Sequence, residues 1–150
     1  MRRPVSPFRF CAAVALAAVL AAARSGEPSI EELKARVAAA SVGDRPRICL
    51  QIAHRQLVEA DKRYAADNPE KAQTALADVV AFSELARDYS IQTHKYEKQT
   101  EIAVLGMTRK LSDMLHTLTH DERPPVEDAI KHLQRVRDDL LASMFPKGAK

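Results

Sequence analysis

The sequence predicts an all-α protein, built either as elongated antiparallel helical hairpins or as a four-helix bundle around one long central helix. Apolar residues recur at spacings of three and four along most of the chain, which is typical of amphipathic helices. No strand-like alternation of apolar and polar residues competes with this pattern. Helix-breaking residues are also rare in the middle of the chain, because only Gly106 lies between Pro69 and Pro124.

The first 23 residues have the three parts of a secretory signal peptide. Three arginines precede an apolar run over 11–23 that ends in three alanines. The run is shorter than the ~20 apolar residues that cross a bilayer, so a membrane anchor is not expected. We therefore predict cleavage near Ala23, export to the periplasm or the exterior, and no stable membrane insertion after cleavage. Residues 24–146 are then a single helical domain, and 147–150 form a polar tail.

Removal of the leader changes the charge of the protein. The full chain has 23 Lys and Arg against 20 Asp and Glu. Arg2, Arg3 and Arg9 leave with residues 1–23, so 20 basic and 20 acidic residues remain and the formal net charge is zero. No basic patch with interleaved aromatic residues is present either. Nucleic acid is therefore not an expected partner.

Two helices are predicted at the start of the domain, and the first of them is short. Ser29 and Glu32 form a capping box, in which each side chain satisfies a free backbone N–H of the other residue. The helix that they open extends to about residue 40 and is stopped by Gly43. A second helix is expected over 45–66.

A long helix and a final helix complete the prediction. Asn68 is the expected N-cap of the long helix, and Pro69 fits its first position, where no backbone donor is needed. If continuous, this helix covers 69–120. The polar segment 90–101 is the weakest part of its apolar seam and the predicted place of a bend, so both a straight rod and a folded bundle remain open. The final helix starts at about 125 and ends before 146.

The hairpin formed by the second helix and the start of the long helix resembles one unit of a tetratricopeptide repeat. Ala60 and Ala72 have the spacing of the small packing residues of that repeat. The other matching residues are Leu57, Tyr64, Asn68, Pro69, Glu70, Lys71 and Leu76. The sequence departs from the family at Gln56, where a large aromatic residue is expected, and no second copy follows at the ~34-residue period. The resemblance therefore implies a helical hairpin and assigns no binding residue.

A second group of apolar residues on the long helix indicates an interaction surface. Val80, Ile91, Ile102 and Leu105 fall opposite the main apolar stripe at roughly 100° per residue. The simpler interpretation is a set of scattered surface residues, which needs no explanation. The alternative is that a further helix, a folded-back half of the chain or a second subunit covers them. We expect this surface to bind a protein partner or to form a homo-oligomer.

Motifs for catalysis are absent, so we expect neither an enzyme nor a bound cofactor. The sequence contains no Gly-rich phosphate loop, no haem-attachment motif and no H-E-x-x-H motif. The alternative function is a metal-binding helical bundle, because His116 and His120 have the i, i+4 spacing of two ligands on one helical face. Asp113 and His132 are further candidate ligands, but the predicted helical angles turn His116 away from the final helix.

Cys49 is the one cysteine that remains after Cys11 leaves with residues 1–23. An intrachain disulfide is then impossible. Cys49 lies at helical spacing with apolar neighbours, which favours a small buried side chain. An intermolecular disulfide in an oxidising compartment is the other interpretation.

Overall fold

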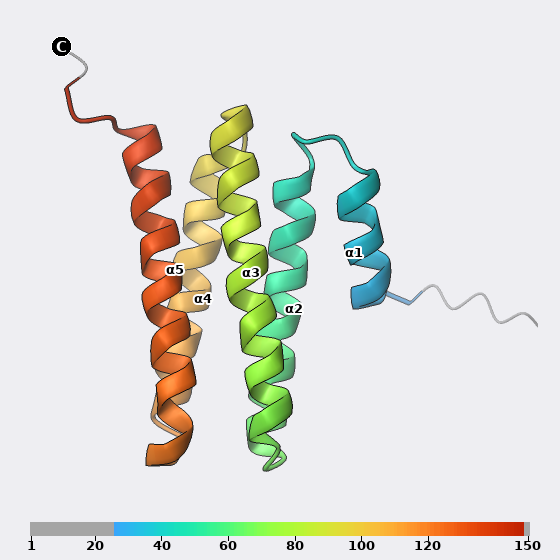
Figure 1. Cartoon of the computed structure of the whole chain (residues 1–150), viewed down its shortest axis with the longest axis vertical. Coiled ribbons are helices and arrows are strands. Elements are labelled where there is room, and N and C mark those ends of the chain that lie inside the picture. Colours follow the sequence, from blue (N-terminus) through green and yellow to red (C-terminus); the bar gives the residue numbers. More distant parts are fainter. Residues whose placement is uncertain (1–25, 149–150) are drawn as a thin grey trace, which may run out of the picture.

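The computed structural model describes residues 26–148, which fold into a four-helix bundle made of two antiparallel hairpins, with a short extra helix on its outside (Figure 1). The elements in chain order are α1 (Ile30–Ala39), α2 (Arg45–Ala65), α3 (Pro69–Thr93), α4 (Glu97–Leu115), the 3-10 turn η1 (His120–Glu122) and α5 (Arg123–Met144). No strand occurs between residues 26 and 148, so the all-α prediction is confirmed. The predicted signal peptide lies outside the described residues.

Two hairpins form the bundle. In one hairpin α2 packs against α3, and in the other α4 packs against α5. The hairpins then associate with α3 beside α5 and α2 beside α4, so the order around the bundle is α2, α3, α5, α4. Helix α1 packs on the outside of α2 (Figure 1). The α2/α4 side and the α3/α5 side are therefore opposite faces of the bundle.

The predicted helix starts have the expected caps. Ser29 Oγ accepts from the Glu32 backbone N–H at 3.1 Å, and the Glu32 carboxylate accepts from the Ser29 N–H at 2.9 Å. Asn68 Oδ1 accepts from the Lys71 N–H, and Pro69 occupies the first position of α3. These polar groups satisfy backbone donors that have no partner within the helix. Local sequence thus fixes where α1 and α3 begin.

Residues 69–120 form two helices rather than one continuous helix, because the chain turns back between α3 and α4. His94 and Tyr96 both adopt left-handed backbone angles, with φ of 51° and 63°. Across the turn, the buried hydroxyls of Ser90 and Thr100 lie 2.9 Å apart and share a hydrogen bond. The bend falls inside the polar segment 90–101, as predicted. The bundle therefore replaces the rod that the apolar seam alone also allowed.

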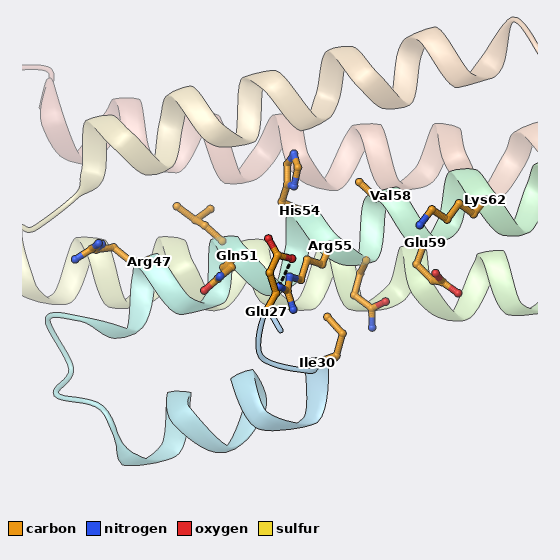
Figure 2. A pocket seen from close by; sticks show the side chains of 11 residues that line it. Glu27, Ile30, Arg47, Gln51, His54, Arg55, Val58, Glu59 and Lys62 are labelled. Atoms are coloured by element: carbon orange, nitrogen blue, oxygen red, sulfur yellow. Dashed lines mark hydrogen bonds and ion pairs between the residues drawn. The ribbon is translucent and has the colours of Figure 1, made fainter. Parts of the chain in front are cut away.

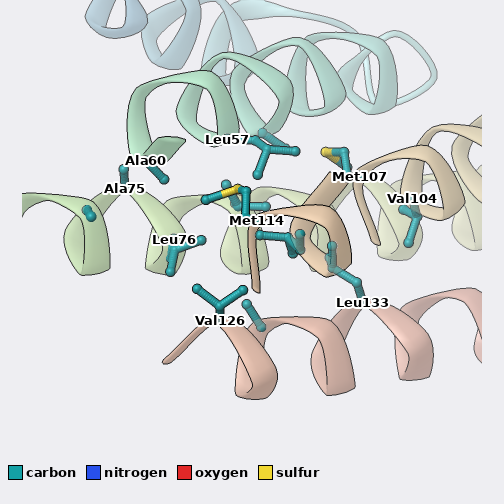
Figure 3. Packing of buried hydrophobic residues seen from close by; sticks show 14 of the residues in the cluster. Leu57, Ala60, Ala75, Leu76, Val104, Met107, Met114, Val126 and Leu133 are labelled. Atoms are coloured by element: carbon teal, nitrogen blue, oxygen red, sulfur yellow. The ribbon is translucent and has the colours of Figure 1, made fainter. Parts of the chain in front are cut away.

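The main core lies between the two hairpins and is built from aliphatic side chains, alanine and methionine (Figure 3). Its best-buried large side chains, each 0% exposed, are Val79, Val104, Leu111, Val126, Leu133, Val136 and Leu140. Ala60 and Ala72 are also fully buried in this cluster. Small side chains at these two sites let α2 and α3 approach closely, which suits the predicted hairpin.

A smaller cluster lies beneath α1. Leu33 and Val37 of α1 pack onto Cys49, Ile52 and Ala86 of α2 and α3. Cys49 is 0% exposed, which confirms the predicted burial. Burial raises the pKa of the thiol to about 11, although the nearby Arg45 opposes this shift. A protonated thiol enclosed by apolar side chains is unreactive, so the structure favours packing over an intermolecular disulfide.

Among residues 26–148, no helix combines the length and the apolar character that spanning a membrane requires.

Candidate functional site

A mostly apolar groove lies between α2 and α4. Its volume is about 470 Å³. Gly106 leaves space in it, because a Cβ placed there meets no atom within 4 Å. The lining residues are Leu50, His54, Leu57, Val58, Ala103, Gly106, Met107 and Lys110. The small residues Ala103 and Gly106 of α4 thus leave an open groove between α4 and the parallel helix α2 at the surface of the bundle.

Val58 of this lining is an exposed large apolar side chain, and so is Ile102, which precedes the lining residue Ala103 on α4. Ile102 is 56% exposed, and Val58 is 42% exposed. On α4, Ile102 is nine residues from the buried Leu111, a separation of about 180° around the helix. Ile102 therefore points directly away from the core.

A larger and more polar groove of about 890 Å³ adjoins the first one on the outer side of α2 (Figure 2). The two grooves share Leu50, His54 and Val58. Figure 2 shows His54 pointing from α2 toward α4. Arg55 binds the Glu27 carboxylate at 2.6 Å and also donates to the Pro28 carbonyl. This contact fastens the segment before α1 to α2, so the polar groove is in part a packing site of the chain itself.

A third groove, of about 410 Å³, lies on the opposite side of the bundle, between α3 and α5. His132 Nδ1 and Glu84 Oε1 lie 3.2 Å apart across it. Three of its ten lining residues are alanines. The lining residues are Gln73, Leu76, Ala77, Val80, Ala81, Glu84, Pro125, Asp128, Ala129 and His132.

The helices that build the two opposite sides differ in charge. Together α2 and α4 carry eight Lys and Arg against five Asp and Glu, a net charge of +3. Together α3 and α5 carry six against eight, a net charge of −2. Within the described chain, Arg47, Lys98 and Arg109 have no ion-pair partner, whereas Lys110 pairs with Asp61 at 3.2 Å. We name the outward sides of α2/α4 and α3/α5 the basic face and the acidic face.

The predicted interaction residues do not form one continuous stripe. Val80 and Ile91 belong to α3 and are partly buried against the main core, whereas Ile102 and Leu105 belong to α4. The turn at 94–96 separates the two pairs and places them on different helices. Val80 lines the groove between α3 and α5, which we name the acidic groove, and Ile102 stands on the basic face. Val58 and Leu50 of α2 join this surface through the pairing of α2 with α4, which helical periodicity along the chain does not predict.

The candidate metal ligands occupy different elements. Helix α4 ends at Leu115, so His116 is its C-cap, and His120 opens the turn η1. The i, i+4 spacing therefore does not correspond to one helical face. His132 faces Glu84 on the far side of the bundle. Within residues 26–148, no three His, Cys, Asp or Glu side chains are grouped as a metal site.

Comparison with protein-family models, with curated proteins and with solved structures gives no match to this chain.

Proposed function

We propose that this chain is an exported helical module, without catalytic activity, that acts by binding a protein through the basic face. The observation that carries this proposal is the exposed Ile102 beside an apolar groove. Protein interfaces are typically centred on apolar anchors that pack against a pocket, with charged residues around them. Ile102 and Val58 supply such anchors, and Lys98 and Arg109 lie around them on α4.

Burial of the exposed part of the Ile102 side chain by a partner would lower the free energy. Full burial of an isoleucine side chain is worth about 1.5–3 kcal/mol relative to exposure, so roughly half of that is available at a site already 44% covered. Val58 adds a smaller amount for the same reason. These gains are too small to hold a complex alone, so the surrounding charges and the groove must contribute as well. The basic face thus suits a contact that combines apolar packing with electrostatic attraction.

Export is the second part of the proposal, and the composition of residues 1–23 supports it. Fractionation of the native host tests this part. We expect the mature protein outside the cytoplasm, shorter at its N-terminus by about 23 residues. An intact N-terminus in the cytoplasmic fraction would contradict export while leaving the binding proposal untouched.

Site-specific photocrosslinking tests the binding proposal. A photoreactive amino acid replaces Ile102 or Val58 in the protein expressed in its native host, and the adducts are analysed by mass spectrometry. The matched control is Gln134, an exposed position of α5 about 180° from Pro125 of the acidic groove. We expect protein adducts from positions 102 and 58 well above those from 134. Equal or absent adducts at all three positions would overturn the proposal.

A further inference from the structure

We propose that the partner of the basic face is the acidic face of a second copy of this chain, so that copies associate head to tail. This inference rests on the proposed function and names the partner. The two faces lie on opposite sides of one bundle, and each carries a groove. The two faces are complementary both in shape and in charge.

The complementarity in shape is the fit between a protruding side chain and a surface with small ones. Ile102 is the most exposed large apolar side chain within any helix of the described chain. The acidic groove is lined by Ala77, Ala81 and Ala129, which leave room between α3 and α5 beside Val80. An isoleucine that enters this groove beside the alanines buries apolar area on both copies. Ile102 is therefore suited to enter the acidic groove of another copy.

The complementarity in charge is the opposite sign of the two faces. On α4, Lys98 lies about one turn before Ile102 and Arg109 about two turns after it, and neither has an ion-pair partner in the described structure. Glu84 and Asp128 line the acidic groove that would receive Ile102; Glu84 lies 3.2 Å from His132, and Asp128 lies 3.2 Å from Lys131. Docking one face on the other brings helices of net charge +3 against helices of net charge −2. Complementary charge of this kind orients an encounter and excludes other arrangements.

The same charges disfavour a symmetric dimer through two basic faces. Such a contact would place Lys98 and Arg109 of both copies in one interface, with Asp113 as the one acidic residue nearby on the outer side of α4. Like charges brought together across an interface cost free energy. A head-to-tail contact avoids this cost, and it leaves one face free at each end of the assembly. The assembly therefore grows with concentration and has no fixed number of copies.

The test measures the mass of the purified protein by light scattering as a function of concentration and salt. We expect the mass to rise above that of the monomer as concentration increases, and to fall when salt is raised from about 0.05 M to about 0.5 M, because salt screens the charges. A protein that stays monomeric at about 100 µM and low salt would overturn this inference. Photocrosslinks from Ile102 to a different protein would in that case still support the proposed function.

Two single-face variants identify the faces. Ile102→Asp blocks the basic face, and Ala81→Arg fills the acidic groove; both positions are exposed, so helicity measured by circular dichroism should be unchanged. Each variant alone should be monomeric. An equimolar mixture should form a dimer and no larger species, because each variant keeps the face that the other has lost. A matched control is Phe145→Asp, which removes an exposed apolar side chain beyond the end of α5 and should associate like the wild type.

The outcomes of the mixture separate the alternatives. If Ile102→Asp is monomeric while Ala81→Arg still forms dimers, the contact is symmetric and the inference is wrong. If both variants are monomeric but the mixture is monomeric too, the two faces do not bind each other and the inference is also wrong.

Discussion

The basic face has an open groove because Gly106 and Ala103 present almost no side chain, and Ile102 projects from it into solvent. The acidic face has a groove lined in part by alanines, and its large apolar lining residues, Leu76 and Val80, are buried and partly buried. The helices of both faces pack on the same core. The two faces therefore differ in their solvent-exposed side chains rather than in the packing beneath them. Surface residues therefore decide what each side of the bundle can bind.

The largest expected effect tests whether the core supports both faces equally. Leu111 of α4 lies behind the basic face and Leu133 of α5 behind the acidic face, and both are 0% exposed. We expect Leu111→Ala and Leu133→Ala each to lower the free energy of unfolding by about 2–5 kcal/mol, from lost burial and the cavity left behind. Urea denaturation of both variants provides the measurement. A cost under about 1 kcal/mol at one site would show that its side of the bundle is loosely packed.

The second prediction concerns the turn that connects the acidic face to the basic face. Ser90→Ala removes the partner of the buried Thr100 hydroxyl, so the free energy of unfolding should fall by about 1–3 kcal/mol. Adding Thr100→Val removes the unpaired hydroxyl and should recover most of the loss. Chemical denaturation of the single and double variants measures this coupling. If the loss in free energy of unfolding of the double variant equals the sum of the losses of the two single variants, the hydrogen bond does not stabilise the turn.

The third prediction concerns the side of α2 that is turned away from the basic face. The pKa of Cys49 is about 11 in the folded protein against 9.0 for an ordinary thiol. Between these values the unfolded chain loses a proton that the folded protein keeps, so stability is full below pH 9 and falls as the pH rises toward 11. We expect this contribution to be up to about 2 kcal/mol. Urea unfolding at several pH values checks it, with Cys49→Ala as the control: the alkaline loss should be smaller in the variant, and equal losses would contradict it.

The smallest expected effect contrasts one residue on each face. Gly106→Ala places a methyl group in open space within a helix and should raise the free energy of unfolding by about 0.5–1 kcal/mol. Ala81→Gly on the acidic face should lower it by a similar amount, because the position is exposed and helical. Thermal denaturation of both variants measures the pair. A lower free energy of unfolding in Gly106→Ala would show that neighbouring side chains occupy the space beside Gly106 in solution.

The sequence predicts the helices well because their ends are encoded locally. Ser29 with Glu32, and Asn68 with Pro69, cap helices wherever they occur, and the structure confirms both starts. The bend inside 90–101 was also predictable from its polar character. The choice between one continuous helix over 69–120 and two helices stayed open, because the turn depends on left-handed backbone angles at His94 and Tyr96 that helical periodicity does not predict.

The candidate site was predictable only in part. Ile102 stands out as an apolar residue opposite the core stripe, and the structure leaves it exposed. Val58 and Leu50 join the site because α2 packs beside α4. This packing depends on how the two hairpins associate, and the helical periodicity of the sequence does not predict it. The same turn that creates this pairing separates Ile91 from Ile102 and places His116 and His120 on different elements.

Disulfide trapping tests the central claim, the contact between the two faces, most directly. Ile102→Cys and Ala81→Cys are made separately, each with Cys49→Ala so that no other described cysteine remains, and the two proteins are mixed under mild oxidation. Gln134→Cys replaces either one as the control. The account predicts a mixed disulfide between positions 102 and 81 well above any disulfide that involves position 134. Predominant 102–102 dimers, or no disulfide above the control, would contradict it.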